Sequence, residues 1–555
     1  MISIVIDTKL SRFQREIKFT LGFICQTLGY NHRFIDDLDK LKQQDILLIY
    51  SFTEPTVDEL KTLASRYITF FIPCDPDFYD PKAYSADRLR RSLREIKLLT
   101  LTPVIASRKF EYPAENYTES EINGGKINFD LVGNVFLQLS NLEERSDSDS
   151  LEKGYYPDSA SAFYQYRETP IVDNLLWLLN SMLIEHCRSK KSHVAQKLFW
   201  PAGQKAAVLL SHSIDDLQKW DLSSIILSVA DDLSLLFTLK WKQLGHILSG
   251  KLKYLFTNYE LYWNFEEFRK LERESNLRST YYLATESTDQ IDYTLEDPDL
   301  QEEIQQILRE GHDIGLLATT DKMNRDDYLT RKQILLHQLN KEQIGIRQLG
   351  YQINDTLRDL HNKINPGFSQ STCFYALPGY KNGMSLPWHP WINGAKADYL
   401  EIPTIYRDEH LKINKHNHIQ LEDAKHQIKK FFQQVLRTHG IFSIDFSIAS
   451  FADIRYMPKL YPYILALVKS SNTWQTTAAE LSKWWEKRAK VTIDEGEYEI
   501  GVLFPDDIES FALCIHGEAK ITEVEGTNTR TEGNTVFFSN QKSGAFGVIR
   551  LAQPE

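Results

Sequence analysis

Seven short apolar runs, separated by helical stretches, constrain the fold of this chain more than any other feature. Each run is strand-like, and the run AAVLLSHSIDD at 206–216 continues into polar residues. The stretches 299–311 and 421–440 carry apolar residues at helical spacing and close on a glycine, which is typical of a helix end. This alternation predicts a βα barrel over residues 166–490, with any chemistry at the carboxyl ends of its strands. The other six runs are 279–284, 312–319, 344–351, 371–378, 402–408 and 441–450.

A second α/β domain is expected before the barrel, over residues 1–165. Strand-like runs lie at Ile2–Ile6, 46–52 and 67–73, and residues 9–28 have helical spacing between the first two. The alternation of strand and helix again indicates an α/β domain.

The character of the sequence changes at two more places. Residues 141–154 (NLEERSDSDSLEKG) are polar, acidic and without periodicity, so we expect a linker or a long solvated loop. Residues 491–555 show short alternating runs with glycine-containing turns, which predict a small C-terminal β domain. The chain is therefore expected to be α/β in class, with three domains.

Composition narrows the class of protein further. Hydrophobic residues make up 42% of the 555 residues, which excludes wholesale disorder, and a net charge of −12 argues against a nucleic-acid partner. Asp7 and Lys9 interrupt the start before an apolar signal region could form, and no run of about 18 apolar residues exists. The cysteines are odd in number and scattered along the chain, which indicates reduced thiols, so we expect a cytoplasmic protein. They are Cys25, Cys74, Cys187, Cys373 and Cys514.

Several passages resemble one family in their order and spacing. WPAGQKAAVLLSHSIDDLQKW (200–220), REGHDIGLLATTD (309–321), IGIRQLGYQIN (344–354) and PGYKNGMSLPWHPW (378–391) are similar to successive motifs of bacterial polysaccharide deacetylases. In the N-terminal third, FDLVGNVFLQLSNLEERSD and ETPIVDNLLWLL resemble the accessory domain of the same branch. The resemblance implies a distorted (β/α)7 barrel of the carbohydrate esterase family four type, with an N-terminal α/β accessory domain.

The family's chemistry is metal-assisted hydrolysis of an acetyl group. The resemblance implies a divalent ion, usually zinc, held by one carboxylate and two imidazoles, with an Asp as general base and a His that protonates the leaving group. Asp215 fills the position of the metal-binding Asp. The remaining positions carry side chains without the required acid, base or metal-binding group: Ser213, Leu317, Leu349, Gln370, Lys381 and Ser447.

These replacements predict a barrel that has kept its fold and lost its metal site. Leucine offers a metal no lone pair, and a carboxylate without nitrogen ligands holds zinc poorly. We therefore expect no cofactor, and a catalytically degenerate homologue rather than an enzyme. Its role would be that of a glycan-binding or assembly component linked to surface-polysaccharide metabolism, with a carbohydrate or protein partner.

Two alternatives remain open. The first is an active N- or O-deacetylase that binds zinc or another divalent metal at a rearranged site, built from Asp215, Asp216, His212 and His312, with Asp313 nearby. Alternation along a strand puts His212 and Ser213 on opposite faces, so we favour structural roles for both histidines. The second alternative is a scaffold with no ligand.

Two further segments have a functional and a structural interpretation. Tyr380, Lys381, Trp388, His389 and Trp391 lie close together in a loop at the expected barrel mouth, where exposed rings could stack on sugars or the tryptophans could cap the core. The basic stretch 239–256 could lie on a membrane surface. Since Gly245 and Gly250 interrupt it, we favour a solvated insertion in the barrel.

Overall fold

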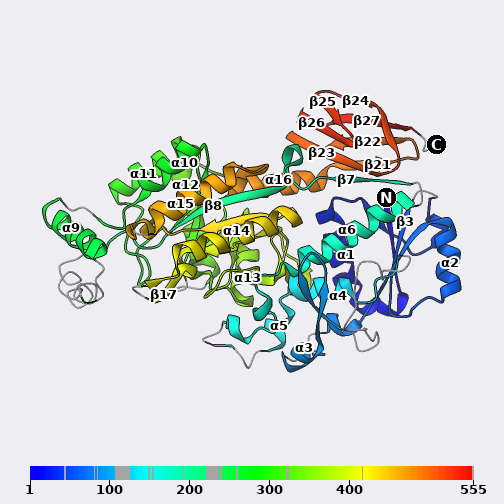
Figure 1. Cartoon of the computed structure of the whole chain (residues 1–555), viewed down its shortest axis with the longest axis horizontal. Helices are drawn as coiled ribbons and strands as arrows, with labels where there is room; N and C mark the ends of the chain where they lie inside the picture. The colour runs from blue at the N-terminus through cyan, green and yellow to red at the C-terminus, as the bar shows by residue number, and fades with distance from the viewer. Residues whose placement is uncertain are drawn as a thin grey trace.

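The structure, a computed structural model, has three parts that correspond to the expected α/β class (Figure 1). An N-terminal α/β unit and a C-terminal β-sandwich lie at one end of the molecule, and a curled parallel sheet surrounded by helices forms the other end. The residues described are 1–42, 45–80, 82–83, 86–106, 125–147, 151–152, 155–189, 192–219, 237, 241–257, 260–319, 324–414, 417–454 and 456–552.

The N-terminal unit is built on a four-stranded parallel sheet in the order β2-β1-β3-β4. Its strands are β1 (Ile2–Ile6), β2 (His32–Phe34), β3 (Ile46–Ser51) and β4 (Ile68–Pro73). Helix α1 (Gln14–Leu28) buries Ile17, Leu21, Ile24 and Leu28, whose spacing puts them on one side of the helix. The other elements are α2 (Val57–Arg66), α3 (Ala86–Ser92), β5 (Leu93–Lys97), β6 (Leu101–Ile105), α4 (Leu131–Leu139), α5 (Leu142–Ser146) and α6 (Ile171–Ser189).

The central sheet contains the seven predicted strands, all paired in parallel. They are β8 (Ala206–Ile214), β9 (Ser279–Leu283), β10 (Asp313–Ala318), β11 (Ile346–Gln348), β12 (Phe368–Thr372), the segment of β15 (Leu400–Pro403) and β16 (Tyr406–Arg407), and β19 (Ile441–Asp445). β15 pairs with β12 at one edge of the sheet, whereas β16 pairs with β19 at the other. One short segment thus joins both edges, and the sheet curls into the distorted (β/α)7 arrangement that was predicted.

Two strands of this region depart from the prediction. The fifth strand covers Phe368–Thr372 rather than 371–378, and β20 (Thr473–Thr476), which pairs with the first half of β8, was not expected. The helices around the sheet are α10 (Phe265–Ser275), α11 (Pro298–Arg309), α12 (Arg325–Leu339), α13 (Asp355–Ile364), α14 (Leu421–Thr438), α15 (Met457–Lys469) and α16 (Ala478–Lys490). Two short hairpins, β13 (Trp391–Ile392) with β14 (Ala395–Lys396) and β17 (Lys412–Asn414) with β18 (Asn417–His418), lie in the connections.

The C-terminal part is a sandwich of two four-stranded antiparallel sheets. One sheet has the order β21-β22-β27-β24 and the other β25-β26-β23-β7, and Phe504, Phe511 and Phe538 pack between them. β7 (His193–Lys197) comes from a segment before the barrel, and it pairs with β23. The other strands are β21 (Thr492–Glu495), β22 (Glu499–Phe504), β23 (Ile508–Gly517), β24 (Lys520–Glu525), β25 (Thr529–Glu532), β26 (Thr535–Gln541) and β27 (Ala545–Ala552).

The acidic stretch at 141–154 is not a solvated linker over its described part. Helix α5 covers Leu142–Ser146, and Leu142 and Glu143 are buried in it. Glu143 accepts hydrogen bonds from the Ser161 hydroxyl and the Ala162 amide, and Glu144 pairs with Arg358 of α13 at 2.8 Å. The acidic residues are thus fixed against the barrel, which local polarity alone did not reveal. Residues 148–150 and 153–154 lie outside the described residues.

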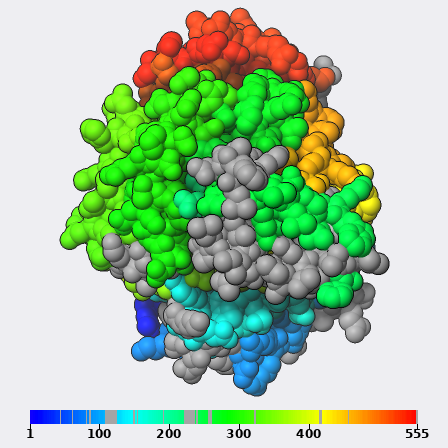
Figure 2. Space-filling model, turned by 90° about the vertical axis from the view of Figure 1, so that its left-hand side faces the viewer, coloured from blue at the N-terminus to red at the C-terminus, as the bar shows by residue number. Residues whose placement is uncertain are grey.

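The basic stretch at 239–256 forms helix α9 (Trp241–Thr257), which continues through Gly245 and Gly250 instead of being interrupted there. The helix lies at the far end of the barrel, on the surface seen in Figure 2. Trp241, Leu248 and Leu252 are exposed on it. Across the described ranges, no helix combines the length and hydropathy needed to cross a bilayer. Contact of α9 with a membrane surface stays the less favoured of the two alternatives.

Candidate functional site

The candidate site lies where β8, β11 and β19 approach one another inside the curled sheet. Ser211 and Ser213, two residues apart on β8, face the same side, as do side chains at alternate positions of any strand. Arg347 comes from β11 and Asp445 from the end of β19. All these side chains are buried, and the side chain of Arg347 is 0% exposed.

Arg347 and Asp445 form an ion pair, and both are hydrogen-bonded to the hydroxyl of Ser213. Arg347 Nη1 donates to Asp445 Oδ1 at 2.6 Å and to Ser213 Oγ at 3.2 Å, and Ser213 Oγ donates to Asp445 Oδ2 at 2.9 Å. Arg347 Nη2 donates to Ser211 Oγ at 2.8 Å. Burial alone would lower the pKa of Arg347, but the Asp445 carboxylate more than offsets this effect and raises it. The position expected for a general base is therefore part of a closed, charge-balanced network.

Polar side chains beneath this pair complete the network. The guanidinium of Arg347 lies over the ring of Tyr282, 3.9 Å from its centroid, which is a cation–π contact. The Tyr282 hydroxyl donates to Gln370 Oε1 at 2.7 Å, and Gln370 Nε2 donates to Ser443 Oγ at 2.8 Å. Gln370 thus serves as a hydrogen-bonding bridge across the barrel interior, where the resemblance implies an Asp.

The acidic pair Asp215–Asp216 follows β8 at its carboxyl end. Ser447 Oγ donates to Asp215 Oδ1 at 2.6 Å. The side chains at two positions aligned with family motifs are therefore hydrogen-bonded to each other. Burial raises the pKa of Asp215, and burial together with the carboxylates of Asp215 and Asp292 raises the pKa of Asp216 to about 6. The acidic residues therefore hold protons more tightly than free carboxyls do.

Among the residues that the structure describes, no nitrogen ligands for a metal join these carboxylates. Leu317 of β10 is 1% exposed and belongs to the hydrophobic core. Leu349 is partly buried and packs against this core. Within the described ranges, no group of three or more His, Cys, Asp or Glu side chains is arranged to hold a metal ion. The residues present do not fit the zinc site that the resemblance implies.

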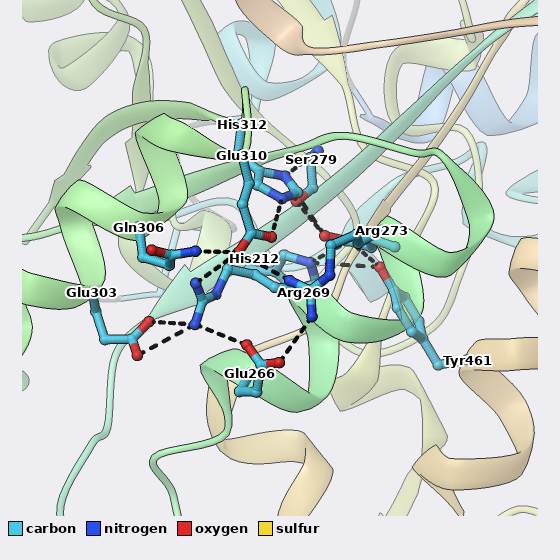
Figure 3. Close-up of polar contacts among 11 residues, drawn as sticks. His212, Glu266, Arg269, Arg273, Ser279, Glu303, Gln306, Glu310, His312 and Tyr461 are labelled. Atoms are coloured by element: carbon cyan, nitrogen blue, oxygen red, sulfur yellow. Dashed lines mark hydrogen bonds and ion pairs between the residues drawn. The ribbon is translucent and has the colours of Figure 1, made fainter.

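His212, one of the alternative metal ligands, is adjacent to Ser213 on β8 and therefore points to the opposite side of the strand. There it lies in one cluster with His312 (Figure 3). His212 Nε2 is 2.9 Å from Glu272 Oε1 of α10, and its Nδ1 is 2.9 Å from the carbonyl oxygen of Phe446. His312 Nδ1 accepts from the backbone amide of Ser279 at 3.0 Å. Both histidines are buried, and their hydrogen-bond partners are Glu272, Phe446 and Ser279 rather than Asp215.

Glu272 is the centre of this cluster. Its carboxylate is 0% exposed and accepts from the hydroxyls of Tyr461, at 2.5 Å, and of Ser279, at 2.9 Å. Burial would raise the pKa of Glu272, but His212, His312 and the Tyr461 hydroxyl lower this pKa. Beside it, Arg269 lies between acidic side chains of α10 and α11, as Figure 3 shows, and pairs with Glu266, Glu303 and Glu310. The neighbouring Asp313 pairs with Lys341 at 2.7 Å.

The aromatic side chains of the loop after β12 are buried rather than exposed. Tyr380 is 3%, Trp388 2% and Trp391 7% exposed, so their ring faces are not open for stacking on sugars. Trp391 contacts Phe19 of α1 and Phe136 of α4, with ring centroids at 4.8 and 6.1 Å. The expectation of an exposed aromatic surface is not met, because the N-terminal unit covers this loop.

The five loop residues are also divided among different surroundings. Lys381, whose Nζ is 3.6 Å from Asp158 Oδ1, lines with Tyr380 a cavity of about 50 Å³, room for only a water or two. Trp388 and His389 line a separate cavity of about 240 Å³.

A larger cleft lies beside the carboxyl ends of β8 and β9. It has a volume of about 640 Å³, and its wall combines aromatic rings with carboxylates. Such a wall suits a sugar, since rings stack on its apolar faces and carboxylates accept from its hydroxyls. The lining residues are Leu217, Gln218, Tyr254, Glu260, Trp263, Tyr293, Asp297, Asp299, Glu302 and Glu303.

Three central residues of these networks were missed in the sequence. Arg347 and Asp445 lie within the strand-like runs 344–351 and 441–450, and Glu272 in α10 belongs to no recognised motif. The available signal was a charged residue in an otherwise apolar strand, since a buried charge needs a partner. Which partner it has depends on pairing between strands far apart in the chain.

No known protein family and no curated protein matches the sequence. Among solved structures, the chain is similar to one from Mycobacterium smegmatis assigned as a polysaccharide deacetylase, to Puue allantoinase, and to one from Pseudomonas aeruginosa PAO1 also assigned as a polysaccharide deacetylase. Each is 13% identical with a TM-score of 0.36, over 52% of this chain and 92–93% of the other.

Proposed function

We propose that this chain is a non-hydrolytic, polysaccharide deacetylase-like protein that binds carbohydrate as a component of surface-polysaccharide metabolism. The observation that supports this most is the network of Arg347, Asp445 and Ser213. At Ser213, where the resemblance implies a general base, the side chains of this network are already paired with one another. A hydroxyl held between a guanidinium and a carboxylate has no free base to accept a proton from water.

The ligand set argues in the same direction. Hydrolysis of this type needs a metal that polarises the acetyl carbonyl and activates water. Asp215 would have to hold that metal with Leu317 and Leu349 at the imidazole positions, and neither leucine offers a lone pair. We therefore assign no hydrolytic step to the barrel.

Carbohydrate binding is supported by the cleft of about 640 Å³ at the carboxyl end of the barrel. Its volume falls within the range of small-molecule sites. Trp263 and Tyr254, which are partly exposed, offer ring surface, and Glu260 and Asp297 offer acceptors for sugar hydroxyls.

Metal content and activity test the non-hydrolytic part. Purified protein is expected to carry substoichiometric zinc, to keep its melting temperature when zinc is added, and to release no acetate from acetylated chitooligosaccharides. Stoichiometric zinc, together with acetate release that Asp215→Asn abolishes, would overturn it and favour the rearranged active site.

A glycan-binding screen tests the carbohydrate part. Binding is expected to weaken about tenfold or more in Trp263→Ala and to stay unchanged in Trp241→Ala, a matched loss of an exposed tryptophan on α9. If no glycan binds, or if the two variants behave alike, the cleft is not a sugar site and the scaffold alternative stands.

A further inference from the structure

A separate cavity of about 240 Å³ lies where the N-terminal unit meets the barrel. Its wall is formed by the carboxyl end of α1, the loop at 387–389, Lys396 of β14 and the carboxyl end of α16. It is distinct from the cleft proposed to bind carbohydrate, since the two share no lining residue.

The cavity is lined by an excess of cations. Lys396, Arg488 and Lys490 face one acidic lining residue, Glu486, and Lys490 is already paired with Asp506 at 3.0 Å. His389 adds no charge, because burial and the nearby Lys396 lower its pKa to about 4. The remaining wall is neutral, so the cavity as a whole favours an anion.

Arg488 is buried without a carboxylate partner among the described residues. Its side chain donates to the carbonyl oxygens of Gln26 and Thr27 at the end of α1, and to those of Lys197 and Leu198 at the end of β7. Burial lowers its pKa to about 9. Carbonyl dipoles at a helix end neutralise a cation only in part, so a negative charge in the cavity would be stabilised here.

Trp388 supplies a hydrogen-bond donor that lacks an acceptor. The residue is 2% exposed, and its indole Nε1 has no partner within the described part of the chain. A buried N–H without an acceptor is unfavourable, and most such groups in folded proteins are paired. Trp388 and Lys396 both line the cavity, so an oxygen-rich anionic group in it would suit both donors.

We propose that this cavity binds a small organic anion, a sugar that carries a carboxylate or a phosphate. The anionic group accepts from the Trp388 indole N–H and the Lys396 ammonium and compensates the charge of Arg488. The ring of the ligand lies against the partly exposed ring of Phe23, which lines the same cavity. The volume is below that of drug-sized sites, which limits the ligand to about a monosaccharide.

Calorimetric titration of the full chain tests the proposal with three probes at constant ionic strength: glucose 6-phosphate, glucuronate and glucose. At least one of the two anions is expected to bind, and comparison of their affinities separates a phosphate from a carboxylate site. Glucose is expected not to bind at this cavity. Failure of both anions to bind, or equal affinity for glucose, overturns the proposal.

Two variants locate the binding. Lys396→Gln, at an exposed position where folding is not at risk, is expected to weaken anion binding about tenfold or more, and Trp388→Phe, which keeps a ring but removes the N–H, about fivefold. Lys483→Gln is the matched control, since it removes an exposed cation of α16 that does not line the cavity. Trp263→Ala is expected to leave anion binding intact, which separates this site from the carbohydrate cleft. Anion binding that Lys396→Gln leaves unchanged refutes the proposal even if Trp388→Phe is unstable.

Discussion

Replacing Asp445 by Asn is expected to destabilise the barrel strongly. The Asp445 carboxylate, 5% exposed, accepts from Arg347 Nη1 at 2.6 Å and from Ser213 Oγ at 2.9 Å. In the variant the guanidinium remains buried, with hydroxyls, a carbonyl and the Tyr282 ring around it but no counter-charge. Removal of one partner of a buried ion pair costs about 3–5 kcal/mol, because the other charge is left uncompensated.

The measurement is the free energy of unfolding in guanidinium chloride, followed by tryptophan fluorescence. Two variants make it specific. Arg347→Met combined with Asp445→Asn removes both charges and is expected to be more stable than Asp445→Asn alone, with a coupling of about 1.5 kcal/mol or more. Glu422→Gln breaks an exposed ion pair with Lys425 and is expected to cost under about 0.5 kcal/mol.

A cost of less than about 1 kcal/mol for Asp445→Asn, or a double variant that loses the sum of the two single losses, would contradict the prediction. Either result would mean that water or structural relaxation screens the Arg347 charge. The network would then be open enough to take part in chemistry, which would count against the proposed non-hydrolytic barrel.

Three other predictions follow from the packing of the same chain. Trp391→Ala is expected to cost about 3–5 kcal/mol and to separate the thermal transitions of the N-terminal unit and the barrel in calorimetry, because this ring joins them. Burial lowers the pKa of His361 to about 3. As pH falls below about 6.5, this imidazole therefore binds a proton in the unfolded chain but not in the folded one. The free energy of unfolding then drops by up to about 1.4 kcal/mol per pH unit for this group. His361→Phe is therefore expected to flatten the loss of stability between pH 6.5 and 4, and an unchanged slope would contradict this sign. Glu272→Gln replaces one acceptor oxygen of the buried cluster by an amide nitrogen and is expected to cost about 1–3 kcal/mol in urea unfolding, because the donors of Tyr461 and Ser279 then compete for a single acceptor, whereas a neutral effect would mean that the cluster relaxes around the amide.

The sequence predicted the strands of the barrel well where their residues are apolar. The predicted position of β12 was wrong because FSQST is polar. Its buried Ser369 and Ser371 are hydrogen-bonded to each other and to β11, and Gln370 is hydrogen-bonded to side chains of β9 and β19. Local periodicity carries no information about such partners. For the same reason β7, five residues that pair with a strand near the end of the chain, gave no signal.

The contacts of the candidate site could not be predicted from the sequence. From their chemistry, Ser213, Leu317 and Leu349 predict that the implied metal site does not form, and this stays a prediction. The pairing of Arg347 with Asp445 joins residues 98 positions apart, and nothing local specifies it. Burial of Trp391 depends on α1 and α4, so the loop's own sequence could not distinguish a ligand surface from a packing surface.

The pairing of β7 with β23 has a consequence for biosynthesis. His516 and Gln196, which contact each other across these two strands, are 320 residues apart. A ribosome that adds about 5–20 residues per second needs roughly 15–60 s to make that interval. During this time β7 has emerged while its partner does not exist, and an unpaired strand edge is a template for wrong pairing with other chains. The nascent chain is therefore expected to depend on a chaperone until translation ends, and truncation before residue 508 would leave that edge permanently unprotected.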